Sequence, residues 1–104
     1  MRPVKQNDTE TAKSFIVVAY DISDDKRRAR LHRKLKKYGM GVQYSVFECI
    51  LTQKQITEMK KMIDKHVDKK QGDRIRYYFL CLACRNRIEA TDALLQQDAT
   101  VVFV

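Results

Sequence analysis

Only three glycines and one proline interrupt this chain of 104 residues, and it contains no tryptophan. Because the glycines are few and scattered, they cannot form the glycine-rich loops that cradle nucleotide phosphates, which excludes a P-loop or a Rossmann fingerprint. No apolar run approaches the roughly 20 residues needed to cross a bilayer. The first residues lack the apolar core of a signal peptide, so we expect no export and no membrane.

The chain also has few cysteines. Three of them, an odd number without an export signal, indicate reduced thiols in the cytoplasm rather than a disulfide framework. Cys81 and Cys84 have C-x2-C spacing, but neither a second pair nor the remaining cysteine and histidines complete a zinc site. We interpret them as a buried strand cysteine and a loop cysteine.

Positive charge is abundant, with 21 Lys or Arg against 13 Asp or Glu and a formal net charge of +8. Hydrophobic residues make up 44% of the chain, enough for a packed core. The length suits one domain. We expect residues 1–14 to be a loose extension and residues 15–104 to form a single domain.

The hydrophobic pattern predicts strands that alternate with helices. The expected elements are a strand at 15–20 buried on both faces, a helix at 26–38, one long strand at 42–51, a helix that begins at Thr52 and bears an apolar stripe to Val67, a strand at 74–82 and a last strand at 100–104. This order is closest to a ferredoxin-like β-α-β-β-α-β domain, an α+β sandwich.

The helix ends carry capping signals. Ser23 is the expected N-cap of the first helix, and Gly39 is the residue expected to end it. Thr52 and Gln55 form the pattern of a capping box at the start of the second helix.

The two later strands predict an assembly. In the segments 42–51 and 74–82, both alternating sets of side chains are substantially apolar. One set of side chains faces the helices. The other set would be exposed to water, because the sequence predicts no further helix long enough to cover it. We therefore predict a sheet-to-sheet homodimer.

The first helix is strongly basic and contains no acidic residue between positions 26 and 38. Such a face attracts phosphates and releases counterions when it binds nucleic acid. The side chains predicted to bind nucleic acid are Arg27, Arg28, Arg30, Arg33, Lys34 and Lys37. The alternative is an ordinary solvated helix with long cationic side chains.

Asp21 directly follows the first buried strand, a position where sites in proteins of mixed α and β structure collect. A carboxylate is a ligand that Mg²⁺ prefers, and one or two carboxylates with substrate phosphates suffice. One aspartate alone more often caps a turn. In a dimer, however, Asp21 and its symmetry mate could share one Mg²⁺ ion and activate water for phosphodiester cleavage.

Three blocks of sequence resemble the CRISPR-associated Cas-two proteins. They are Tyr20-Asp21-Ile22-Ser23-Asp24-Asp25-Lys26-Arg27-Arg28, then Tyr38-Gly39, then Val42-Gln43-Tyr44-Ser45-Val46-Phe47-Glu48-Cys49. The resemblance covers about residues 15–82. It implies a ferredoxin-like homodimer, a metal-ligating and catalytic Asp21 paired with its mate, and Mg²⁺-dependent endonuclease activity on RNA or duplex DNA. It further implies a role in spacer acquisition, in which the dimer bridges CRISPR integrase subunits along duplex DNA.

Within this interpretation, Ser23 and Phe47 are candidates for shaping the site around Asp21. Three alternatives stay open. The protein could be a non-catalytic nucleic-acid scaffold or a toxin-type messenger-RNA interferase on the same fold. It could also be a single-strand RNA-binding module that stacks bases on Tyr44, Tyr77 and Phe79, provided the sheet is exposed.

Overall fold

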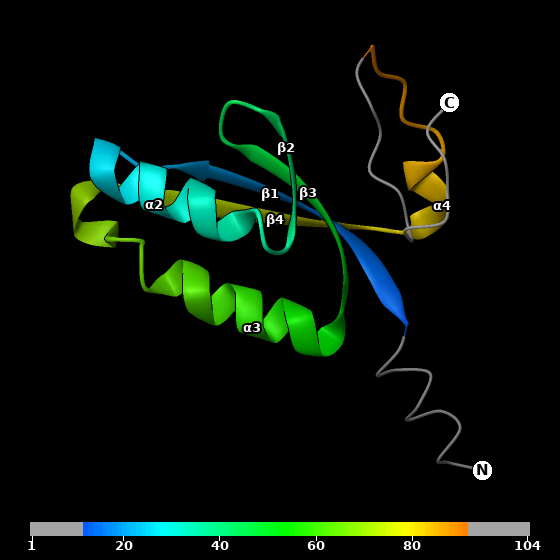
Figure 1. Ribbon diagram of the computed structural model, residues 1–104, viewed down its shortest axis with the longest axis horizontal. Helices are drawn as coiled ribbons and strands as arrows, with labels where there is room; N and C mark the ends of the chain where they lie inside the picture. Colours follow the sequence, from blue (N-terminus) through cyan, green and yellow to red (C-terminus); the bar gives the residue numbers. More distant parts are fainter. Residues whose placement is uncertain (1–11, 92–104) are drawn as a thin grey trace.

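An antiparallel sheet of four strands forms one layer of the molecule, and two helices cover one of its faces (Figure 1). The computed structural model describes residues 12–91. Its elements are β1 (Lys13–Asp21), α2 (Asp25–Leu35), β2 (Gly39–Gln43), β3 (Val46–Thr52), α3 (Gln53–Asp64), a 3-10 turn (Lys69–Gln71), β4 (Arg74–Leu80) and α4 (Leu82–Arg85). This α+β arrangement agrees with the predicted ferredoxin-like fold.

The strand order is β2-β3-β1-β4, so β1 lies inside the sheet as the apolar run predicts. It pairs antiparallel with β3 on one side and with β4 on the other. Val18, for example, is aligned with Phe47 of β3 and with Tyr77 of β4. Side chains aligned in this way point to the same face of the sheet, which divides each strand into an inner and an outer set.

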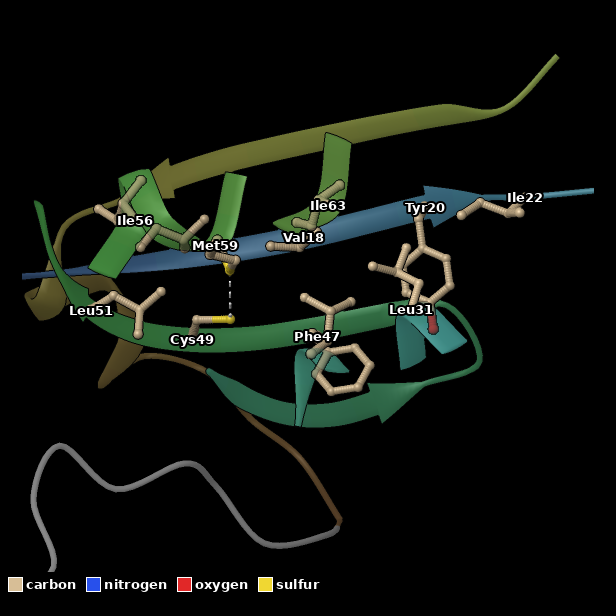
Figure 2. Close-up of a cluster of buried hydrophobic side chains, with 12 residues drawn as sticks. Val18, Tyr20, Ile22, Leu31, Phe47, Cys49, Leu51, Ile56, Met59 and Ile63 are labelled. Atoms are coloured by element: carbon tan, nitrogen blue, oxygen red, sulfur yellow. Dashed lines mark hydrogen bonds between the residues drawn. The ribbon is translucent and has the colours of Figure 1, made fainter. Parts of the chain in front are cut away.

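The core lies between the sheet and the helices α2 and α3 (Figure 2). Its buried residues are Ile16, Val18, Tyr20, Ile22, Leu31, Leu35, Phe47, Cys49, Leu51, Ile56, Met59 and Ile63. The predicted apolar stripes are confirmed at Leu31 and Leu35 of α2 and at Ile56, Met59 and Ile63 of α3. Val67, expected to extend the second stripe, lies beyond α3, which ends at Asp64. Burying each large aliphatic side chain contributes about 1.5–3 kcal/mol, so this layer dominates the stability.

The prediction of one long strand at 42–51 is wrong, because this segment turns at Tyr44 and Ser45 and forms the hairpin β2–β3. Ser45 has φ of 130°, a conformation that favours glycine. Its carbonyl oxygen accepts a hydrogen bond from the backbone N–H of Tyr20 at 3.0 Å, which ties the turn to β1. Gly39 begins β2 and is not the residue that ends the preceding helix.

The ends of α2 also differ from the prediction. The N-cap is Asp24 rather than Ser23, and its carboxylate accepts a hydrogen bond from the N–H of Arg27 at 2.9 Å. The helix ends at Leu35 rather than Tyr38. The capping box of Thr52 and Gln55 is confirmed at the start of α3.

Beyond α3, the chain makes a 3-10 turn that ends at Gly72, whose φ of 86° suits glycine. Strand β4 ends at Leu80, and the expected strand at 100–104 lies outside the described residues. Most of the expected N-terminal extension lies outside them as well, and β1 begins at Lys13. In the described part of the chain, no helix is both long and apolar enough to cross a membrane.

Candidate metal and nucleic-acid site

Asp21 is the last residue of β1, and its side chain is exposed. In the sheet it is aligned with Arg74 of β4. Asp21 belongs to the outer set of β1, because Ile16, Val18 and Tyr20 occupy the core side. A hollow of about 220 Å³ next to it is lined by Ala19, Tyr20, Asp21, Arg74 and Arg76. The carboxylate therefore stands at one end of the sheet's outer face, beside two arginines.

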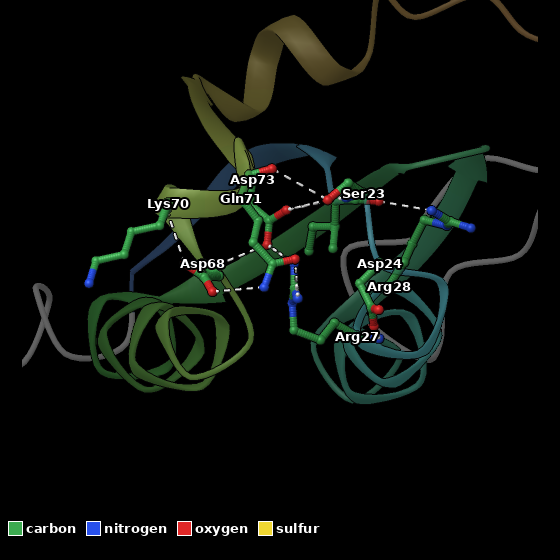
Figure 3. A network of polar contacts seen from close by, with 9 residues as sticks. Ser23, Asp24, Arg27, Arg28, Asp68, Lys70, Gln71 and Asp73 are labelled. Carbon is green, nitrogen blue, oxygen red and sulfur yellow. Dashed lines mark hydrogen bonds and ion pairs between the residues drawn. The ribbon is translucent and has the colours of Figure 1, made fainter.

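The rest of this outer face is largely apolar. The cross-strand pairs place on it the apolar side chains Val17, Ala19, Val46, Ile50, Tyr78 and Leu80. Glu48 also lies on this face, opposite Val17, and so does Phe15, which is fully buried. Tyr78 is 44% exposed and Leu80 is 42% exposed. In Figure 3, seen along the helices, α2 and α3 both lie on the opposite side of the sheet. Among the described elements only α4 lies on the outer side, where it packs against β1.

A Mg²⁺ ion fits Asp21 only if other ligands join it. Among residues 12–91, no group of three His, Cys, Asp or Glu side chains comes together to hold a metal. Asp24 is committed to capping α2, and Asp25 is ion-paired with Arg28. Within the described residues, one chain thus offers one carboxylate at this position. This set matches a Mg²⁺ ion shared with a second carboxylate and substrate phosphates, not an ion enclosed by one chain.

The loop after Asp21 is fixed by Asp73, a buried carboxylate that sequence reasoning missed (Figure 3). Asp73 accepts hydrogen bonds from the backbone N–H groups of Ser23, at 3.2 Å, and Asp68, at 2.9 Å. It also forms an ion pair with Arg27 at 2.6 Å. Burial by itself raises the pKa of Asp73, but the hydrogen bonds and the guanidinium outweigh it and leave that pKa lowered.

The six cationic residues predicted to bind nucleic acid separate into two groups. Arg27 is held by Asp73, and Arg28 donates to the carbonyl oxygen of Ile22 at 2.8 Å while pairing with Asp25. These two fasten α2 to the loop. The exposed members of the set are Arg30, Arg33, Lys34 and Lys37. Long side chains that are exposed and close together along one helix are suited to contact a phosphate backbone.

A second hollow, of about 350 Å³, lies between α2 and the turn of the β2–β3 hairpin. Its lining includes Tyr20, Arg28, His32, Arg33 and Tyr44. The Tyr20 hydroxyl and Nδ1 of His32 are hydrogen-bonded at 3.1 Å. Burial raises the pKa of Tyr20, and this effect exceeds the lowering of the pKa by the positive charge of Arg28. Tyr44 is 88% exposed.

The two residues expected to shape the site occupy different environments. Phe47 is fully buried, with its ring edge-on to His32 at 5.1 Å between centroids. It therefore packs against His32, which lines the second hollow. Ser23 lies in the loop after Asp21, where its hydroxyl is within 3.4 Å of the Gln71 carbonyl oxygen.

Known proteins resemble this chain along most of its length. The model of the family described as CRISPR associated protein Cas2 matches residues 14–88. A CRISPR-associated endoribonuclease Cas2 of Chloroflexus aurantiacus is 39% identical over 75 residues, which cover 72% of this chain and 81% of that protein.

Two solved structures share the fold. Cas2 of Streptococcus pyogenes superposes with a TM-score of 0.66 at 30% identity and covers 75% of this chain and 99% of its own. A chain of a partial Cas6-RT-Cas1–Cas2 complex has a TM-score of 0.62 at 28% identity and covers 75% of this chain and 90% of its own. With the family model spanning β1 to beyond α4, this chain belongs to the CRISPR associated protein Cas2 family.

Proposed function

We propose that this protein acts in CRISPR spacer acquisition as a homodimer that binds duplex nucleic acid beside the integrase. We further propose that the Asp21 side chains of two protomers form a Mg²⁺-dependent endonuclease site for RNA or double-stranded DNA. The observation that carries this proposal is the position of Asp21: an exposed carboxylate at the end of an apolar sheet face that two helices leave uncovered.

The outer face supports the dimer. Its apolar rows on β3, β1 and β4 include Ala19 aligned with Val46 and Val17 aligned with Tyr78, with Glu48 of β3 opposite Val17. A second copy offers the same rows, so one two-fold contact buries both faces at once. Because Asp21 lies on this face, the same contact brings the two carboxylates toward each other.

In the proposed cleavage, the metal ion and the side chains of this protein have separate roles. A bound Mg²⁺ polarises a phosphoryl oxygen and lowers the pKa of a water molecule. Asp21 supplies a hard oxygen ligand, and Arg74 and Arg76 next to it carry the positive charge that attracts the substrate phosphate. The network around Asp73 holds the loop that follows Asp21 in place.

The partner proposal rests on relatives and on charge. One of the similar structures is that of a partial Cas6-RT-Cas1–Cas2 complex, in which a Cas2 chain is assembled with Cas1. In this chain, Arg30, Arg33, Lys34 and Lys37 are exposed and provide a cationic strip on α2 and its C-terminal end for the duplex. These side chains bind the phosphates and not the bases, so we expect little sequence preference.

A cleavage panel tests the catalytic part. End-labelled RNA and duplex DNA are incubated with the wild type, Asp21→Asn and the control Asp64→Asn, whose exposed carboxylate lies at the end of α3. We expect Mg²⁺-dependent cutting by the wild type and Asp64→Asn, and at least a hundredfold loss in Asp21→Asn. Cutting that persists in EDTA or in Asp21→Asn would contradict the assignment.

Fluorescence anisotropy with a labelled duplex tests the binding part. Arg30→Gln with Arg33→Gln should weaken binding and make the salt slope shallower by about 0.9 for each phosphate that is no longer neutralised. The control Lys54→Gln with Lys61→Gln removes the same charge from α3 and should bind more tightly than the α2 variant. Equal weakening in both pairs would mean that net charge, not α2, governs binding.

A further inference from the structure

Two cysteines meet at the turn that follows β4. Cys81 is the N-cap of α4 and Cys84 lies inside that helix, and their sulfur atoms are 2.9 Å apart. Both are free thiols and both are exposed. The prediction that one of them lies in a buried strand is wrong, since β4 ends at Leu80.

We propose that Cys81 and Cys84 form a redox-active dithiol, which closes to an intrachain disulfide by exchange with a small-molecule disulfide such as oxidised glutathione. Geometry supports this first. The two sulfurs already touch across one turn of chain, and closure to a bond of about 2.05 Å requires only a small shift of the side chains. Their exposure lets the co-reactant reach them.

The two thiols are not equivalent, which gives the exchange a direction. The two thiols share a hydrogen bond in which either can donate, but the backbone N–H of Cys84 points at the Cys81 sulfur and donates to it at 3.3 Å. The pKa of Cys81 is lowered, first by its hydrogen bond with the Cys84 thiol and then by this N–H. The pKa of Cys84 is raised, chiefly by its hydrogen bond with the Cys81 thiol. The thiolate is the reactive form, so Cys81 is the attacking sulfur and Cys84 the resolving one.

The exchange proceeds in two balanced steps. The Cys81 thiolate attacks one sulfur of oxidised glutathione, which forms a mixed disulfide at Cys81 and releases one glutathione thiolate. The Cys84 sulfur, after losing its proton, attacks Cys81, forms the Cys81–Cys84 bond and releases the second glutathione. The protein dithiol is oxidised by two electrons, and one molecule of oxidised glutathione is reduced to two thiols.

Cys49 is an internal control. It is fully buried in the core, with its sulfur 4.0 Å from that of Met59. Burial, with a smaller contribution from the charge of Glu48, raises its pKa to about 12. Cys49 should therefore neither exchange nor react with alkylating agents while the protein stays folded.

The test equilibrates the reduced full-length protein with glutathione mixtures of increasing oxidised fraction, followed by acid quenching, alkylation under denaturing conditions and intact-mass measurement. We expect a transition from three alkylated cysteines to one, with Cys49 the residue still labelled in peptide maps. In Cys84→Ser, the mixed disulfide should accumulate at Cys81. In Cys81→Ser, glutathione should add to Cys84 at least tenfold more slowly.

Three outcomes would overturn the proposal: three free thiols at every glutathione ratio, stable glutathione adducts on both cysteines of the wild type, or disulfides that join two chains. Each is visible in the same mass spectra, and none depends on nuclease activity. The test is therefore independent of the function proposed above.

Discussion

At the scale of single residues, Asp73 fastens the loop that follows Asp21 to α2 and to the segment before β4. Its partner Arg27 lies 46 positions away in the chain, and no local pattern connects the two. Sequence reasoning singled out Asp21 as a candidate because a carboxylate that ends an apolar strand is a local signal. It missed Asp73 because the ion pair forms only when α2 and the residue that precedes β4 meet in the folded chain.

Asp73→Asn should lower the free energy of unfolding by about 3 kcal/mol at pH 7, since it leaves the Arg27 guanidinium without its buried counter-charge. Urea denaturation measures this, with Glu58→Gln as the control that neutralises an exposed carboxylate on α3. A loss no larger than that of Glu58→Gln would show that the ion pair contributes little.

The same pair predicts a dependence on pH. The native pKa of Asp73 is lowered, so its contribution to stability is fully present above the pKa of an unfolded aspartate, about 3.9. It is lost as the pH falls through the native value. The difference in unfolding free energy between wild type and Asp73→Asn should therefore stay constant from pH 7 to about 5 and shrink below about 4.

At the scale of elements, the sequence predicted those segments whose signals are local. The capping box of Thr52 and Gln55 appears as expected, and so does the apolar stripe of α3 as far as Ile63. The β2–β3 hairpin was missed because its turn, Tyr44–Ser45, contains no glycine, asparagine or proline. The alternation of side chains continues through it, so the pattern alone resembles one strand.

Gly39 shows how closely this hairpin is packed. A methyl group at Gly39 would collide with the carbonyl oxygen of Glu48 and would lie 2.6 Å from the sulfur of Cys49, whereas one at Gly41 would meet only the Phe47 and His32 rings at ordinary contact distances. We expect Gly39→Ala to cost about 2–3 kcal/mol in the free energy of unfolding and Gly41→Ala less than about 1. Paired chemical denaturation of the two variants measures the difference, and equal costs would mean that β2 shifts freely.

At the scale of the whole molecule, the two faces of the sheet differ in how far other elements cover them. Helices α2 and α3 cover most of the inner face, where Phe79 of β4 remains 52% exposed, while the outer face presents the exposed Tyr78 and Leu80 beside Val17. Exposed apolar patches of this kind commonly mark interfaces between chains. The sequence indicated a second apolar face because both alternating sets of side chains are substantially apolar. The position of Asp21 on that face follows only from the register of β1 and β4.

Val17→Lys places a charge in the middle of the outer face and leaves the helix-side core unchanged, because Val17 alternates with the buried Ile16 and Val18. We expect the wild type to have a solution mass near twice the 12.3 kDa of one chain, and Val17→Lys to be a monomer with an unchanged far-UV circular dichroism spectrum. Thr57→Lys adds the same charge to an exposed position of α3 and should remain a dimer. Light scattering measures the masses.

If the two Asp21 side chains share one ion, the monomeric variant must also lose cleavage although its own Asp21 is intact. A monomeric variant that still cuts would show that one carboxylate suffices.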